Sequence, residues 1–222
     1  MMTQTVCYVF SVSAADEDSE GNMVGLSASF ADDTIAWYEN DGSEAFTPHT
    51  ITTTADSPRS VFAADVDGDG DMDVLSASSS DDKIAWYEND GSESFTPHTI
   101  TTTADCAQSI FAADVNGDGD MDVLSSSILD NKIAWYENDG SESFTEHAIT
   151  TSADYANTVY AADMDGDGDM DVLSASNYDD KIAWYENNGS ESFTEHVIST
   201  SANGAFSVHA VDVDADGDMD VL

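Results

Sequence analysis

The fold is decided by residues 60–101, which read SVFAADVDGDGDMDVLSASSSDDKIAWYENDGSESFTPHTIT. Short runs of small, β-branched or aromatic residues alternate here with clusters of Asp, Gly, Asn and Ser, a pattern typical of strands joined by turns. The expected strands are 60–65, 72–78, 83–88 and 95–101. Asp90-Gly91 is a hairpin signal between the last two strands, and Pro97 indicates a sheet edge. No segment has the spacing of an amphipathic helix, so the stretch predicts four antiparallel strands.

The whole chain repeats this pattern. The string AWYEN recurs every 49 residues, at Trp37, Trp86, Trp135 and Trp184, and DGDMDVL recurs with the same period. Repeats of this length with four strands each are typical of the blades of a β-propeller. We therefore predict an all-β fold, a β-propeller of four-stranded blades with about four and a half blades in 222 residues. The expected blades are 8–56, 57–105, 106–154 and 155–203, with an incomplete last blade at 204–222 that stops after its second strand.

Each blade has four expected strands, here named A to D in chain order. Strand A is the least polar and is expected to line the central channel, whereas strand D is expected at the outer edge. Adjacent strand residues face opposite ways, so one member of each Trp-Tyr pair should pack between blades. One histidine recurs on each strand D, and symmetric copies on different outer strands cannot converge on a single metal ion. These residues are expected to pack across strands, and they are His49, His98, His147 and His196.

The loop between strands A and B is acidic. In the second period its positions 1, 3, 5, 7 and 9 are Asp65, Asp67, Asp69, Asp71 and Asp73. Alternating acids in a tight loop turn their oxygens towards one point, and several carboxylates suit Ca²⁺ better than Mg²⁺. An EF-hand would need Glu at position 12, where these loops have Ser, so that motif is excluded. The pattern predicts about one Ca²⁺ for each acidic loop.

The other copies of the loop differ in their ligands. The third period has Asp114, Asn116, Asp118, Asp120 and Asp122; the fourth has Asp163, Asp165, Asp167, Asp169 and Asp171; the fifth has Asp212, Asp214, Asp216, Asp218 and Asp220. The first copy has Asp16, Asp18, Glu20 and Asn22, with Val24 at position 9. Since this first loop lacks the last carboxylate, its site is predicted to be weak or empty.

The loop D-x-D-G-D-G-x-x-D, with the strand that follows it and the IAWYEN strand in fixed register, resembles the FG-GAP or VCBS repeat family. The resemblance covers nearly all of the chain and implies a calcium-loaded propeller, like those of integrins, in an extracellular or cell-surface protein. It implies no single activity, because such propellers occur in adhesins, in structural proteins and as accessory domains of enzymes. The chain departs from the family in blade count, since members typically close with more blades, often seven.

Composition excludes several classes of partner. The chain has 46 Asp and Glu against 4 Lys and Arg, a formal net charge of −42. Four cations cannot form the basic patch that nucleic acids or anionic membranes require. No apolar run approaches the ~20 residues of a membrane span, so no membrane insertion is expected. Catalytic motifs such as GxSxG and HExxH are absent from the sequence, and we expect no enzymatic activity.

These observations favour a non-enzymatic extracellular calcium-binding propeller with a structural or adhesive role. The unfinished blade predicts self-assembly into an oligomer or fibre, because unpaired strand edges recruit other chains. The alternative is a carbohydrate- or ligand-binding accessory propeller of a larger secreted enzyme or cell-surface receptor. The repeats differ most in the B–C and D–A loops, which emerge on one face. A glycan or protein ligand is expected there, near Arg59, Tyr155, Tyr178 and Phe206.

Overall fold

The computed structural model describes the backbone of residues 9–15 and the complete residues 24–40, 42 and 45–222. Within these ranges the chain forms strands joined by turns, and it has no helix that is long and apolar enough to cross a membrane.

The strands form four four-stranded antiparallel sheets and one two-stranded sheet, each with its strands in chain order. The first sheet contains β1 (Val9–Ala15), β2 (Val24–Ser29), β3 (Thr34–Asn40) and β4 (Phe46–Thr52). The second contains β5 (Pro58–Ala64), β6 (Asp73–Ser78), β7 (Lys83–Asn89) and β8 (Phe95–Thr101). The third contains β9 (Ala107–Ala113), β10 (Asp122–Ser127), β11 (Lys132–Asn138) and β12 (Phe144–Thr150). The fourth contains β13 (Ala156–Ala162), β14 (Asp171–Ser176), β15 (Lys181–Asn187) and β16 (Phe193–Ser199), and the fifth has β17 (Ala210–Val211) and β18 (Asp220–Val221).

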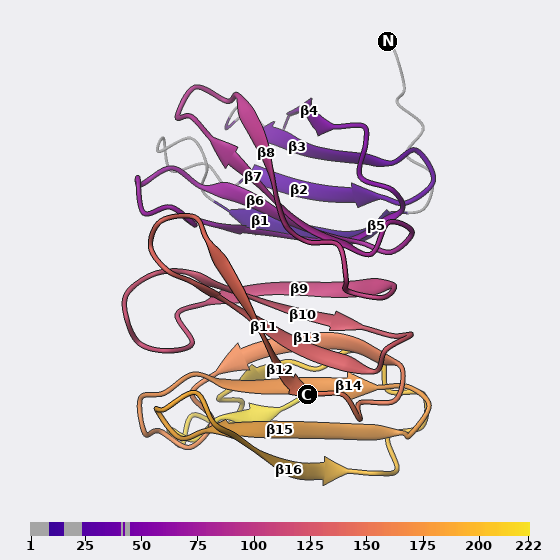
Figure 1. Cartoon of the computed structure of the whole chain (residues 1–222), viewed down its shortest axis with the longest axis vertical. Helices are drawn as coiled ribbons and strands as arrows, with labels where there is room; N and C mark the ends of the chain where they lie inside the picture. The colour runs from indigo at the N-terminus through magenta and orange to yellow at the C-terminus, as the bar shows by residue number, and fades with distance from the viewer. Residues whose placement is uncertain (1–8, 16–23, 41, 43–44) are drawn as a thin grey trace.

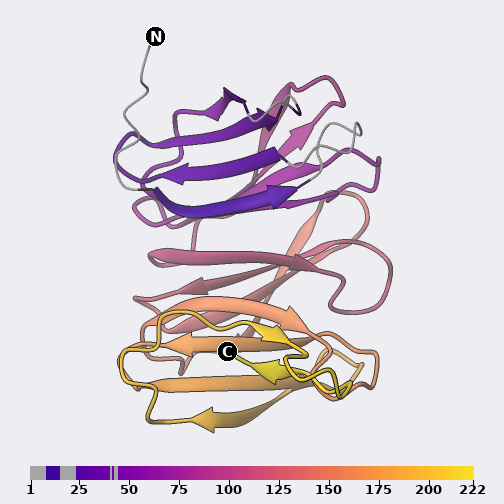
Figure 2. The same ribbon diagram turned by 180° about the vertical axis from the view of Figure 1, so that it is seen from behind.

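The sheets stack face to face along the long axis of the molecule (Figure 1). Their first strands lie closest together, because β5 contacts both β1 and β9, and β13 contacts both β9 and β17. The view from behind shows the first sheet at one end and the fourth at the other, with the short fifth sheet in front of the fourth (Figure 2). The molecule is therefore an open arc of propeller blades, four complete and one partial. Strand A lies innermost, and the largely exposed strands β4, β8, β12 and β16 lie outermost, as predicted.

Packing between blades depends on the AWYEN strand. Trp86 and Tyr87 are adjacent on β7 and point to opposite faces of their sheet. Trp86 packs in a core that includes Ile110 and Tyr136 of the third blade, whereas Tyr87 packs in a core with Leu26 of the first blade. Both side chains are almost fully buried, with 0% and 3% exposure. The sequence predicted one core residue in the pair, but both are core, because each face of the sheet packs against a different neighbouring blade.

The recurring histidines pack across strands as predicted. His98 lies directly opposite Trp86 in the antiparallel register, and its ring stacks on the indole with centroids 4.4 Å apart. His98 Nε2 also lies 2.7 Å from Glu88 Oε2 on the neighbouring strand. The same stack and the same histidine–glutamate hydrogen bond recur in the other three complete blades.

The fifth sheet is short, and it leaves part of the fourth blade uncovered. Trp135 is fully buried and contacts the ring of Phe193 in the next blade, with centroids 6.4 Å apart. Its copy Trp184 keeps the histidine stack but is only partly buried. The difference arises because the blade that follows Trp184 has only strands A and B in this chain.

Candidate functional site

In each described acidic loop, the carboxylate at position 1 accepts main-chain N–H groups and so fixes the shape of the loop. Asp65 Oδ1 accepts a hydrogen bond from the Gly68 N–H at 2.9 Å, and Asp65 Oδ2 accepts one from the Gly70 N–H at 3.1 Å. Gly70 has φ of +99°, a backbone conformation that other residues rarely adopt. Asp114, Asp163 and Asp212 make the equivalent bonds in the following blades. The local sequence thus sets the shape of the loop before any ion binds.

In three of the acidic loops, the carboxylates at positions 1, 3 and 9 converge. Oxygen atoms of Asp65, Asp67 and Asp73 all lie within 4.8 Å of one another. The same spacing occurs in the fourth blade with Asp163, Asp165 and Asp171, and in the partial blade with Asp212, Asp214 and Asp220. Like charges this close repel one another, and an all-oxygen donor set with several carboxylates is what a hard divalent cation requires. These residues could therefore hold a metal ion, and their chemistry fits Ca²⁺.

Position 9 joins the loop to the turn between strands C and D. Asp73 Oδ2 accepts the Val66 N–H at 2.9 Å within the loop, and Asp73 Oδ1 accepts the Asn89 N–H at 2.8 Å at the end of β7. Asp73 is fully buried. Burial raises the pKa of Asp73 to about 6, although the two N–H groups and the Trp86 indole act in the opposite direction. The carboxylate is therefore costly to bury in its charged form, and a nearby cation would lower that cost.

Sequence reasoning treated Asp73 only as a ligand and missed this second role. The pair of Asp73 and Asn89 recurs as Asp122 with Asn138 and as Asp171 with Asn187, with the same bonds and the same separation of 16 residues. The side chains of Asn138 and Asn187 also bond the acidic loop of the preceding blade, at the carbonyls of Val66 and Val115. The sequence did carry one signal of this contact, namely the constant separation of 16 residues between each Asp and its Asn.

Positions 5 and 7 lie outside the triad. Asp69 Oδ1 accepts the N–H of Asp71 at 2.9 Å, which stiffens the loop. The Asp71 carboxylate lies so close to Gly91 that a side chain at that glycine would collide with it. The same places are occupied in the next two blades by Asp118, Asp120, Asp167 and Asp169. In the partial blade the Asp216 carboxylate accepts the Asp218 N–H.

The loops are not equivalent. In the third blade Asn116 stands at position 3, and its side-chain N–H donates to Asp118 at 2.9 Å. In the partial blade Asp220 is exposed. It accepts the Val213 N–H within the loop, but the described part of this blade has no third strand whose N–H could bond its other oxygen. The first loop, with Asp16, Asp18, Glu20 and Asn22, lies outside the described residues.

Replacement of Gly140 by Ala should destabilise the fold more than replacement of Gly117 by Ala. Both glycines have positive φ, +69° and +76°, and each replacement should cost about 1–2 kcal/mol for the backbone alone. A side chain at Gly140 would also displace the Asp120 carboxylate, whereas nothing lies within 4 Å of a side chain at Gly117. Ala215 already occupies the position of Gly117 in the partial blade, with φ of 61°. We expect an additional ~1 kcal/mol for Gly140→Ala in denaturant unfolding.

The matched test is a double-mutant cycle with Asp120→Ala. If Asp120 causes the extra cost, Gly140→Ala should cost no more than Gly117→Ala in the Asp120→Ala background. Equal costs for the two glycine variants in the parent chain would show that Asp120 does not pack on the turn.

The opposite face carries the D–A and B–C loops, which are tied together. The Ser79 N–H donates to the Ser57 carbonyl at 3.1 Å, and Asp82 Oδ1 accepts the Cys106 N–H at 2.9 Å between neighbouring blades. The Arg59 guanidinium lies 4.4 Å from the centre of the Phe30 ring. The two loop classes therefore form one continuous surface.

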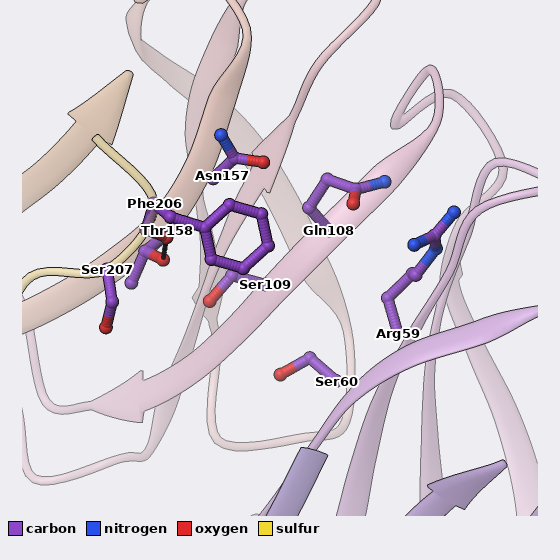
Figure 3. A pocket seen from close by; sticks show the side chains of 8 residues that line it. All are labelled: Arg59, Ser60, Gln108, Ser109, Asn157, Thr158, Phe206 and Ser207. Carbon is purple, nitrogen blue, oxygen red and sulfur yellow. Dashed lines mark hydrogen bonds between the residues drawn. The ribbon is translucent and has the colours of Figure 1, made fainter. Parts of the chain in front are cut away.

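A pocket of about 260 Å³ opens on this face. The inner strands β5, β9 and β13 and the segment before β17 line it with residues at two repeat positions (Figure 3). These residues are Arg59, Gln108, Asn157 and Phe206 at the first position and Ser60, Ser109, Thr158 and Ser207 at the second. Of the four side chains expected at a ligand surface, Arg59 and Phe206 line the pocket. The other two, Tyr155 and Tyr178, are not among its lining residues and stack on each other with centroids 4.3 Å apart.

Comparison with known proteins assigns the repeats to a family. The model of the FG-GAP-like repeat matches residues 23–76, 65–125, 126–174 and 163–222. No curated protein matches the chain.

Solved structures share the fold at low sequence identity. An Agrocybe aegerita lectin that recognises non-reducing terminal N-acetylglucosamine aligns with a TM-score of 0.65 and 17% identity over 95% of this chain and 60% of its own. The V. cholerae biofilm matrix protein Bap1 aligns with a TM-score of 0.59 and 22% identity over 90% of this chain and 30% of its own. Virginiamycin B lyase from Staphylococcus aureus aligns with a TM-score of 0.62 and 16% identity over 91% of this chain and 60% of its own. The chain thus spans 60% or less of the length of these proteins.

Proposed function

Because the chain belongs to the FG-GAP-like repeat family, we propose that it is a non-enzymatic extracellular propeller, stabilised by Ca²⁺, with a structural or adhesive role. The observation that carries the proposal is the convergence of three carboxylates at the same loop positions in three different blades. Repetition in register supports a shared purpose for these groups, since three unpaired acids at one point destabilise a fold unless a cation offsets their repulsion.

Asp65, Asp67 and Asp73 would hold the ion in the second blade, and the equivalent residues would do so in the others. A bound Ca²⁺ supplies positive charge and oxygen coordination at the point where the loop meets the buried Asp73. Asp73 already bonds both the loop and the end of β7, so an ion on the triad stabilises the contact between strands A, B and C. Binding that requires the folded loop adds directly to folding stability.

An extracellular location agrees with the expected affinity. Calcium sites of extracellular modules bind at roughly 10⁻⁴–10⁻³ M, which suits surroundings rich in calcium. The biofilm matrix protein and the lectin have the same fold, which supports a structural or ligand-binding role. The lyase shares the fold as well, so the non-enzymatic part of the proposal rests on the sequence, which has no catalytic motif.

Calorimetric titration with Ca²⁺ tests the proposal directly. We expect about four ions per chain, one for each loop beginning at Asp65, Asp114, Asp163 and Asp212. Asp165→Ala should remove one ion, because Asp165 belongs to a triad and, among the described residues, otherwise accepts only the Asp167 N–H. Asp105→Ala is the matched control, since it removes the same charge from an exposed D–A loop. Absence of binding heat from a folded chain would refute the calcium role.

The second candidate is an accessory propeller that binds a carbohydrate or another ligand for a larger secreted enzyme or receptor. The pocket between the inner strands favours it, because concave sites with a few polar groups are where small ligands bind. A glycan array screen separates the candidates: selective binding favours the accessory role, and binding to no glycan favours a purely structural one.

Self-association is proposed at the open end of the arc. A groove of about 480 Å³ there is lined mainly by apolar side chains, among them Ile182, Ile198 and Val221. The equivalent of Ile182 in the third blade, Ile133, is fully buried against Ala183 and Tyr185 of the next blade's third strand. We propose that a strand from a second copy of this chain occupies the groove, since an unpaired edge beside apolar surface favours pairing.

Sedimentation in calcium should therefore show oligomers that a peptide of residues 181–200 dissociates, because this peptide carries the strand and hairpin that fill the equivalent space in complete blades. A scrambled peptide of the same composition is the control. A monomer at all accessible concentrations would refute self-association.

A further inference from the structure

Side chains from four successive blades form a cup at the inner edge of the arc. Its wall consists of hydroxyl side chains at one repeat position, namely Ser60, Ser109, Thr158 and Ser207. Two of these groups fasten neighbouring blades: Ser60 Oγ accepts the Ile110 N–H at 3.4 Å, and Thr158 Oγ1 donates to the Phe206 carbonyl at 2.7 Å. Among the described residues, the hydroxyls of Ser109 and Ser207 have no such partner, so they are available to a ligand.

An aromatic row lies beneath the hydroxyl wall. Residues two apart on a strand share a face, so Phe62 and Phe111 follow Ser60 and Ser109 on the side towards the arc's centre. Their rings contact each other with centroids 4.7 Å apart, Phe111 contacts Tyr160 at 4.7 Å, and Tyr160 contacts His209 at 4.5 Å. This continuous row holds the inner strands at a fixed spacing and keeps the cup preformed.

The rim of the cup offers both polar groups and one exposed ring. The side chains of Arg59, Gln108, Asn157 and Phe206 also line the cup (Figure 3). Asn157 is buried and donates to the carbonyls of Tyr155 and Ala205, which fixes its position. Phe206 is 65% exposed at the pocket edge, where its face can receive a ligand. Aromatic faces beside hydrogen-bonding groups are suited to amphipathic ligands.

Charge selects the ligand further. No carboxylate of the described residues lines the cup, although the chain has 46 acidic residues, and one of its four cations lies among the lining residues. Arg59 is already engaged, since its Nε donates to Ser79 Oγ at 3.3 Å and its guanidinium covers Phe30. A strongly acidic molecule repels anionic ligands over a distance of about 10 Å at moderate salt. These observations favour a ligand that is uncharged and rich in hydroxyl groups.

We propose that the cup binds a single neutral sugar unit, such as the end of a glycan chain. The volume of about 260 Å³ lies near the lower end of the ~300–1,000 Å³ range of small-molecule pockets and suits one sugar ring. The amide nitrogens of Gln108 and Asn157 already donate to main-chain carbonyls, so these two residues offer their side-chain oxygens as acceptors. The hydroxyl wall and these oxygens pair with sugar hydroxyls, and the Phe206 ring receives the apolar face of the sugar. This inference rests on the ligand-binding candidate above and names its site and ligand class.

Saturation-transfer NMR on the whole chain in calcium tests the inference. The probes are the methyl glycosides of glucose, galactose, mannose and N-acetylglucosamine, with methyl glucuronide as the anionic comparison, all at millimolar concentration. At least one neutral glycoside should receive saturation and should bind more tightly than the glucuronide. Phe206→Ala should weaken its binding about tenfold, because a ring contact is lost.

Tyr178→Ala is the matched control, since Tyr178 is also an aromatic of the same face, 67% exposed, and does not line the cup. Its affinity should equal that of the parent chain. Ser109→Tyr fills the cup and should abolish binding, which gives a second variant that leaves Phe206 in place.

Three results would overturn the inference. The first is the absence of saturation transfer to every neutral glycoside, and the second is a preference for the glucuronide. The third is an affinity that Phe206→Ala and Ser109→Tyr leave unchanged, or that Tyr178→Ala lowers as much as they do. None of these results touches the calcium-stabilised propeller, whose failure would instead appear as a calcium titration without binding.

Discussion

Removal of calcium with excess chelator is expected to lower the melting temperature of this chain by about 10 °C or more. A ligand present at 10–100 times its dissociation constant contributes about 1.4–2.7 kcal/mol per site. Four loops of this kind would contribute about 5–11 kcal/mol in sum, which is comparable with the whole stability of many domains. In a chain of 222 residues each 1 kcal/mol corresponds to roughly 2–4 °C.

The cause of this large effect is the arrangement of charge. Without a cation the three carboxylates of each triad lie within 4.8 Å of one another, and one of them is fully buried in the second and fourth blades. Thermal unfolding followed by circular dichroism, with calcium, with magnesium and with chelator, measures the effect. Calcium should protect more than magnesium, because the flexible oxygen geometry of the loops suits the larger ion.

A high concentration of sodium chloride is the essential control. Salt screens the general repulsion of a chain with net charge −42, but it does not coordinate the triads. If salt alone restores the melting temperature in chelator, the acids act through bulk charge and the sites are not specific. An unchanged midpoint in chelator would refute the structural role of calcium.

Replacement of Trp135 by Ala is expected to cost about 3–5 kcal/mol of unfolding free energy, the range for large buried aromatics. Trp135 is fully buried, stacks on His147 with centroids 4.6 Å apart and contacts Phe193 of the next blade. The replacement would therefore leave a cavity at the interface between the third and fourth blades.

Trp184→Ala is the internal control and should cost about half as much. It stands at the same repeat position and makes the same stack on His196 at 4.6 Å, but no complete blade covers it in this chain. Denaturant unfolding of the two variants, compared at equal calcium, measures the difference. Equal losses would show that stability comes from the stack inside a blade and not from packing between blades.

The strands could be predicted because their signals are local. The string FTPHTIT was expected to form an outer strand, and β8 spans Phe95–Thr101 at the sheet edge. KIAWYE was expected to be a strand, and β7 spans Lys83–Asn89. Alternation and turn residues within one repeat carry this information, and the 49-residue period extends it to every blade.

The functional groups were predicted less completely, because their partners lie outside the motif. The loop pattern identified five alternating positions as ligands, but it could not tell which of them converge. The structure brings positions 1, 3 and 9 together and directs Asp71 against Gly91, a residue of the C–D turn. The second role of Asp73 likewise depends on Asn89, which the chain reaches only after two further strands.

The sequence by itself determined the repeat, the four-stranded blades, the acidic loops and the family, because each is encoded within a single period. Only the tertiary structure decided which carboxylates meet, how Asp73 joins the loop to the C–D turn, and that a polar cup lies on the face opposite the acidic loops. Ser60, Ser109, Thr158 and Ser207 are ordinary residues of separate blades and carry no motif. They become one site because packing of the blades through Trp and Tyr places the first strand of each blade beside the next.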